Sequence, residues 1–300
     1  MNAPRHPRAR PRLSHLSRPS PASLLPALVL AVCVAGCDGG GSASNVRAPG
    51  AETSPTTKAL DAGAAALQNR APIEAINAYL DGFHFYAGRM EEQMEAHHYC
   101  AILNEDVIQC VIYDGNVKDA KLMGVEYIVT ERLFKDLPDA EKALWHSHVH
   151  EVKSGQLVAP GIPQVAENEL MKKLVGTYGK TWHTWHTDRQ KTLPLGVPQL
   201  MMGFTADGQV HADMVEARDR RMGIRSADKK QERESIAAPA IAPGADAWKN
   251  GGAVQLRDPT GQEHHGQGSP GAQGHRDGQA VQAGTAGNAP QGGHAGHGGK

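Results

Sequence analysis

Three histidines at alternate positions are the residues of this sequence best suited to chemistry. They lie in the segment ALWHSHVHEV as His146, His148 and His150. In a β-strand, every second side chain points to the same face, so a His-x-His pair presents two imidazoles to one side. A bound zinc ion needs three or four His, Cys or carboxylate ligands at about 2.0–2.3 Å. The pattern therefore indicates a candidate site for a divalent transition metal, centred on His146 and His148.

Additional metal ligands would have to come from other segments of the chain. We expect His98, in AHHYC, or His183, in WHTWH, to lie close enough to share an ion with His146 and His148. Other side chains of suitable type are His97, His186 and Glu151. The alternative is that these histidines lie in a half-buried sheet and only hydrogen-bond to their neighbours. The sequence leaves both possibilities open.

Known catalytic motifs do not help to choose between them. The sequence has no Gly-x-Ser-x-Gly motif, no phosphate-binding loop and no dinucleotide fingerprint. It therefore names no reaction, and whether the protein is an enzyme stays open.

The elements that would position these side chains follow from hydrophobic periodicity and from Gly and Pro positions. The sequence predicts helices over 57–70, 72–85, 137–145, 165–179 and 212–222. It predicts a β-hairpin over 96–115 and strands over 120–134, 146–152, 180–188 and 198–208. Because strands and helices mix without a regular βαβ order, we expect the α+β class. The expected architecture is a single mixed domain of mainly antiparallel strands with flanking helices, over residues 71–225.

Two cysteines lie in the predicted hairpin. If Asn104, Glu105 and Asp106 form a three-residue loop, Leu103 pairs with Val107, and Cys100 lies directly opposite Cys110. Facing cysteines come near disulfide distance. A disulfide between Cys100 and Cys110 is therefore possible, and a pair of free thiols, or a thiol that shares a metal with His98, is the alternative.

The two ends of the chain differ from the middle in composition. Residues 1–36 begin with five arginines and continue into the short apolar run ASLLPALVLAVCVAG, which is typical of a secretory signal. The run ends in VAGC, which resembles the lipobox of bacterial lipoproteins. That resemblance implies cleavage before Cys37 and acylation of its sulfur. Residues 37–70 are expected to be a flexible tether, and residues 226–300 a disordered Gly/Gln/His-rich tail.

The net charge of the chain and its expected export indicate which partners and which cellular location to expect. Removing residues 1–36 takes away five arginines and no acidic residue, so 31 basic and 32 acidic residues become 26 and 32, a net charge of −6. A mildly acidic chain is a poor nucleic-acid binder. We expect membrane lipid to be the partner, through acylated Cys37, and the periplasmic side of the cell envelope to be the location.

Several ordered blocks resemble one known family, between about Ile76 and Gly223. They are FHFYAG, EAHHYC, QCVIYD, GVEYIV, LWHSHVHEVKSGQLVAPG, YGKTWHTW and LPLGVPQLMMGF. They resemble the oil body-associated proteins, whose plant members associate with lipid droplets and affect droplet size and stability. The resemblance implies no reaction and no cofactor. The family pattern includes Trp145–His148 but has no histidine equivalent to His150 or His186.

Two functions from different classes follow. The first is a membrane-anchored lipoprotein of the oil body-associated family, with a lipid-interface or structural role. The second is a metal-binding protein or metal-dependent enzyme that uses the His-x-His strand, with a divalent transition metal as cofactor. The family resemblance favours the first.

Overall fold

The computed structural model describes residues 41–189 and 192–257. The predicted signal peptide, Cys37 and residues 258–300 of the predicted tail lie outside these ranges. The described strands are β1 (Ala78–Tyr86), β2 (Arg89–Ile102), β3 (Val107–Tyr113), β4 (Leu122–Thr130), β5 (His146–Ser147), β6 (Thr177–His183) and β7 (Gln199–Met202). The described helices are α1 (Pro55–Leu67), α2 (Ala71–Glu74), α3 (Glu131–Lys135), α4 (Asp139–Lys142), α5 (Val149–Ser154), α6 (Gln164–Leu174), α7 (Ala212–Met222), α8 (Ser226–Glu232) and the 3-10 helix η1 (Ala247–Asn250).

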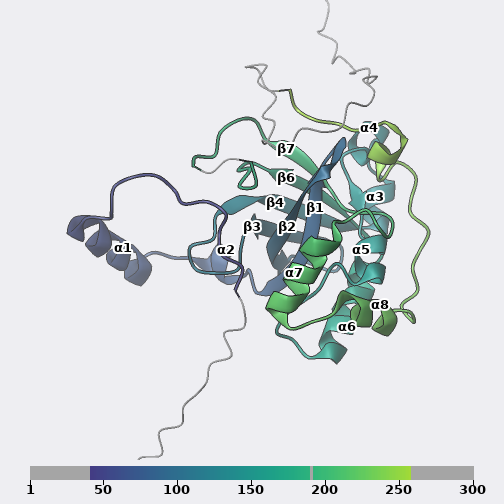
Figure 1. Cartoon of the computed structure of the whole chain (residues 1–300), viewed down its shortest axis with the longest axis horizontal. Coiled ribbons are helices and arrows are strands. Elements are labelled where there is room, and N and C mark those ends of the chain that lie inside the picture. The colour runs from purple at the N-terminus through teal and green to yellow at the C-terminus, as the bar shows by residue number, and fades with distance from the viewer. Residues whose placement is uncertain (1–40, 190–191, 258–300) are drawn as a thin grey trace, which may run out of the picture. The chain divides into compact units, whose positions relative to one another are not determined.

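Strand pairing makes a closed antiparallel sheet. The strand order is β4-β3-β2-β1-β7-β6-β5, and β6 also pairs with β4, which closes the sheet into a barrel. Helix α7 crosses the face of β1 and β2, while α5, α6 and α8 group at one side (Figure 1). The α+β class, with antiparallel strands and flanking helices in one domain, is confirmed.

The strands carry two different faces because their side chains alternate. On β1, Phe83 and Phe85 point outward and pack with Met202 and Phe204 against α7 and Trp248. His84, between the two phenylalanines, points to the opposite face, which is the barrel interior. A second apolar cluster lies where Leu80, Cys100, Cys110 and Ile128 meet α5 and α6, and it includes Val152, Leu157, Met171 and Leu174.

Several predicted elements are wrong in type or extent, and three of them bear on the site. The predicted helix over 72–85 ends at Glu74, and its second half is β1, which is buried on both faces and so lacks the alternation that identifies a strand. The predicted strand over 146–152 stops at Ser147, and α5 follows it. Helix α6 ends at Leu174, so Gly179 lies inside β6 and not at a helix end.

The folded part extends beyond the predicted limits on both sides. After residue 225, α8 continues the fold, Ile236 and Ala242 are buried, and the fully buried Arg233 donates to the carbonyl oxygens of Val152 and Leu157. Before residue 71, Val46 is buried and Ser44 donates a hydrogen bond to Asp114. The amino-acid composition did not predict that these two segments are folded, because only a few apolar side chains and buried polar contacts attach them to the domain. Among the described helices, none is long and apolar enough to cross a membrane.

The hairpin register is the predicted one. Cys100 pairs with Cys110, Ala101 with Gln109 and Ile102 with Ile108, and the amide of Leu103 donates to the carbonyl of Val107. The two cysteines are joined by a disulfide, with their Cα atoms 4.0 Å apart.

Thiol counting on protein purified without reductant tests this disulfide. Denatured, unreduced protein is expected to show no free thiol at Cys100 and Cys110. Replacing both with serine is expected to lower the free energy of unfolding by about 3 kcal/mol, because the crosslink closes a short loop in the unfolded chain. Two free thiols in such protein would contradict the expectation.

Candidate functional site

A glutamate stands at the centre of the barrel interior. Glu126 lies in the middle of β4, where alternation turns its side chain inward and leaves its neighbour Tyr127 47% exposed. One carboxylate oxygen, Oε2, lies 3.0 Å from His98 Nε2. The other, Oε1, lies 3.3 Å from His148 Nε2 and 3.4 Å from His146 Nε2. Three imidazoles, one from β2 and two from the segment His146–His148, therefore converge on one buried carboxylate.

The hydrogen bonds of His98 and His148 fix which ring nitrogens face Glu126 as acceptors. His98 Nδ1 lies 3.0 Å from the carbonyl oxygen of Ala96, which can only accept, so Nδ1 carries the hydrogen. His148 Nδ1 lies 2.8 Å from Thr177 Oγ1, whose own hydrogen is donated to the carbonyl of Leu174. In the neutral form of each ring, Nε2 then presents a lone pair to the carboxylate.

Other polar side chains line the same space. Glu151, on α5, places Oε2 3.9 Å from Nε2 of both His146 and His148. The ring of His84 lies 5.7 Å from that of His146 and 5.5 Å from that of His183, between centroids. Ligand atoms of His84, Glu126 and His146 lie within 4.8 Å of one another, as do those of His146, His148 and Glu151. We call these seven residues the interior cluster: His84, His98, Glu126, His146, His148, Glu151 and His183.

Several polar atoms of the interior cluster lack a hydrogen bond although they are buried. Among the described residues, neither ring nitrogen of His146 or of His183 finds a partner, and neither does Glu151 Oε2. Native proteins leave few buried polar atoms unsatisfied. A small cavity of about 10 Å³ lies next to five members of the cluster, His84, His98, Glu126, His148 and Glu151, and is also lined by aliphatic residues. The unpaired atoms and the cavity indicate a site built around an additional small group.

Burial governs the charge states in the interior cluster. It lowers the pKa of His84 well below its usual value and those of His146 and His183 to about 3, so these three rings are neutral. Burial also raises the pKa of Glu151 well above its usual value, with a further contribution from the charge of Glu126. For Glu126 burial acts in the same direction, but His148 and His98 outweigh it, and its pKa lies well below the usual value.

Two glycines leave room for the interior cluster. Gly179, on β6, pairs with both His146 and Ile128. A Cβ atom there would overlap Glu126 Oε1 and would come within 2.8 Å of His148 Nε2. A Cβ atom at Gly203 would come within 2.8 Å of the carboxylate of Glu151. The backbone at both positions is thus part of the wall of the site.

The structure brings together the four histidines that the sequence singled out, but not by one strand. His146 lies on β5, while His148 lies just before α5 with φ −85° and ψ 0°, and this turn aims both rings at Glu126. His183 lies beside His84, farther from the carboxylate. His150, the third histidine of the alternating row, points away and faces Asp207 at 3.9 Å.

Two of the remaining histidine candidates lie outside the interior cluster. His97 is on the outer face, as alternation requires for the neighbour of His98, and His186 contacts Tyr86 and the carbonyl of Val197.

Glu126 and His84 were not among the residues predicted from the sequence to form the site. Glu126 had a usable signal, because a lone acidic residue in the apolar strand LMGVEYIVT must be buried or mark a site. His84 was hidden because residues 72–85 were predicted to be helical.

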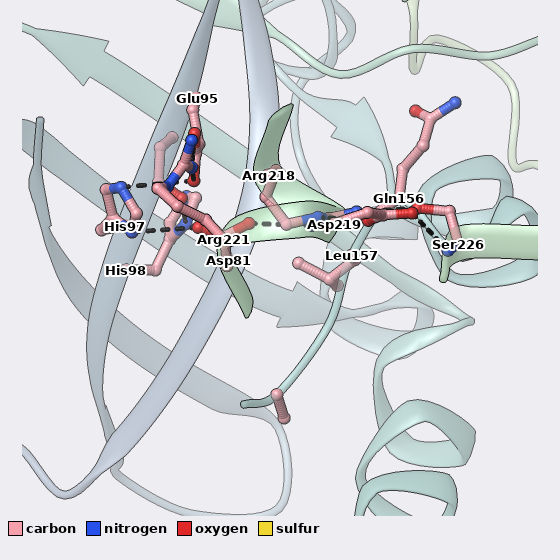
Figure 2. A network of polar contacts seen from close by, with 12 residues as sticks. Asp81, Glu95, His97, His98, Gln156, Leu157, Arg218, Asp219, Arg221 and Ser226 are labelled. Atoms are coloured by element: carbon pink, nitrogen blue, oxygen red, sulfur yellow. Dashed lines mark hydrogen bonds and ion pairs between the residues drawn. The ribbon is translucent and has the colours of Figure 1, made fainter. Parts of the chain in front are cut away.

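A second group of ligand-type side chains, on the outer face, differs in its charge balance. Asp81 lies 2.9 Å from His97 Nδ1 and 2.8 Å from Arg218 Nη1, and Glu95 is paired with Arg221. Figure 2 shows Arg218 and Arg221 of α7 meeting these carboxylates. Because each carboxylate already has a guanidinium partner, this network fastens α7 to the sheet and needs no ion.

Comparison with known proteins identifies the family. The family described as "protein of unknown function (DUF1264)" matches residues 70–237. Oil body-associated protein 1A of Zea mays is 44% identical over 219 residues, which are 72% of this chain and 92% of that protein. The chain belongs to the oil body-associated protein family. A second member, oil body-associated protein 1B of Arabidopsis thaliana, is 42% identical over 70% of this chain and 88% of its own length. No solved structure matches the chain.

The family match covers the part of the chain that forms the site. Residues 70–237 include all seven described strands and helices α2 to α8. The N-terminal region with Cys37 and the His-rich tail lie outside it. The oil body-associated proteins are therefore related to this chain through the barrel and its helices.

Proposed function

We propose that this member of the oil body-associated family acts at a lipid surface in the cell envelope, where acylated Cys37 anchors it. The observation that carries the proposal is the match, over about 70% of this chain, to relatives named oil body-associated proteins. The arginine-led apolar run that ends in VAGC supports the anchor. A lipid-modified cysteine supplies membrane affinity without any spanning helix, because each buried methylene contributes about 0.8 kcal/mol.

The anchor is tested by replacing Cys37 with serine. The wild-type chain is expected in the membrane fraction, and the Cys37→Ser variant is expected to be released from it. Cys33→Ser is the matched control, because Cys33 lies only four residues earlier in the same apolar run and outside VAGC. It should leave the membrane association unchanged. A processed Cys37→Ser chain that still sediments with membranes would refute the anchor.

A second experiment distinguishes membrane binding by the acylated Cys37 from lipid binding by the folded domain. The released Cys37→Ser chain is mixed with triacylglycerol droplets coated with phospholipid and is then floated. Cofloating protein would support a lipid-surface role for the barrel and its helices. Protein that stays in the aqueous layer would restrict lipid contact to the acyl chain and would remove the functional link to the plant relatives.

A further inference from the structure

We propose that Glu126, His146 and His148 bind one divalent transition-metal ion inside the barrel, with Glu151 as the adjacent fourth ligand. The site goes beyond the lipid-surface role and does not depend on it. Its arguments are the spacing of the ligand atoms, the direction of their lone pairs and the charge balance of the interior cluster.

The spacing of the ligand atoms fits a single ion. Two ligands that each lie about 2.1 Å from a tetrahedral ion are about 3.4 Å apart. Glu126 Oε1 lies 3.4 Å from His146 Nε2 and 3.3 Å from His148 Nε2. Glu151 Oε2 lies 3.9 Å from both histidine nitrogens, slightly farther than this separation.

The lone pairs point at the place where the ion would lie. When His148 donates its Nδ1 hydrogen to Thr177 and the ring is neutral, Nε2 directs its lone pair at Glu126 Oε1, 3.3 Å away, and the two lone pairs repel each other. A cation between the two atoms turns this repulsion into two coordinate bonds. Metal-binding histidines characteristically donate their other ring N–H to an oxygen, as His148 does here to Thr177.

The charge balance separates this site from the outer network. Both contain two carboxyl groups near histidines, and all of these are buried except Glu95, which is partly exposed. In the outer network Arg218 and Arg221 supply the positive charge. In the interior cluster the described residues give Glu126 and Glu151 only histidine partners, and no lysine or arginine. A divalent ion would supply the missing positive charge.

The ligand set restricts the class of ion. Two imidazoles and two carboxylates suit zinc, iron(II), manganese, cobalt and nickel. Calcium and magnesium prefer sets made of oxygen ligands. The proposal is therefore a first-row transition metal.

Metal analysis of the full mature chain tests the site. The chain is purified in detergent without a metal-affinity step, and its content of first-row metals is measured. We expect about one ion per chain, at least tenfold less in His148→Ala and in the nearly isosteric Glu126→Gln, and an unchanged content in His150→Ala. His150 lies two residues from His148 but outside the interior cluster, so it is the matched control. A full-length chain with glutamine at His264, His265, His275, His294 and His297 excludes binding by the tail and should keep the ion.

Cobalt(II) titration of the chelator-treated wild type needs no variant in the barrel. Binding at this site should saturate near one equivalent, give visible absorption bands of a four- or five-coordinate ion and raise the Tm. A wild type that carries no metal and shows no Tm change with zinc, manganese, iron(II) or cobalt would overturn the proposal. So would a metal content that falls only when the tail histidines are replaced.

Discussion

Replacing Gly179 with alanine is expected to lower the free energy of unfolding by about 3 kcal/mol, the upper part of the usual range for overpacking. The added methyl group would overlap Glu126 Oε1 and crowd His148 Nε2. Strand β6 cannot move aside, because at this residue it pairs with both β4 and β5. Chemical denaturation of the purified variant measures the loss, and its metal content should fall together with its stability.

The matched control is a glycine-to-alanine substitution at a position where the added methyl group has no close neighbour. Gly63 lies in α1, where a Cβ atom would meet nothing within 4 Å and where the helix has no buried residue. Gly63→Ala is therefore not expected to destabilise the chain, and the better helix propensity of alanine favours the variant by at most about 1 kcal/mol. A Gly179→Ala chain as stable as Gly63→Ala would show that the interior cluster is not packed as described.

Replacing Arg218 with methionine is expected to cost about 3–5 kcal/mol, because it leaves a buried carboxylate without its partner. Arg218 is fully buried and donates to Asp81, to Asp219, to the carbonyl of Gln156 and to Ser226 (Figure 2). These contacts tie α7 to β1 and to the segment that leads into α8. The loss is measured by urea denaturation at pH 7.

Arg220→Met is the control, since this arginine is two positions away on α7, is 72% exposed and pairs only loosely with Glu216. It should cost less than about 0.5 kcal/mol. An Arg218→Met chain with the stability of Arg220→Met would contradict the role given to the buried pair.

The ion pair between Asp81 and Arg218 also predicts how the free energy of unfolding changes with pH. Burial raises the pKa of Asp81, but the hydrogen bond from His97 and the charge of Arg218 outweigh it, so the net pKa is lowered. The stabilisation from ionised Asp81 is complete above its ordinary pKa of 3.8 and is lost as the pH falls through the lower folded value. The difference between wild type and Arg218→Met should therefore shrink only in strongly acidic solution.

Sequence patterns predicted those parts of the fold that depend on residues close together in the chain. The hairpin register follows from a three-residue loop, and α7 has its predicted bounds because its periodicity and Gly223 are unambiguous. Strand β1 was missed because it is buried on both faces, so its pattern resembles a buried helix. The closure of the sheet by β4 and β6 depends on contacts between distant segments, which no local pattern reports.

The sequence predicted the histidines of the site but not the glutamate at its centre. His98, His146, His148 and His183 were found because histidines at strand spacing are rare enough to stand out. Glu126 could not be connected with them, since it joins His98 and His148 only after the barrel closes. The turn at His148, which redirects the chain into α5, likewise depends on pairing with Thr177.

The central claim is that the interior cluster holds a metal ion, and an anomalous difference map tests it most directly. Crystals of the protein are measured on both sides of the absorption edge of the metal found by elemental analysis. One strong peak is predicted between Glu126 Oε1, His146 Nε2 and His148 Nε2, at about 2.0–2.2 Å from each. A map with no peak there, and with water or direct hydrogen bonds linking Glu126 to the histidines, would contradict the claim.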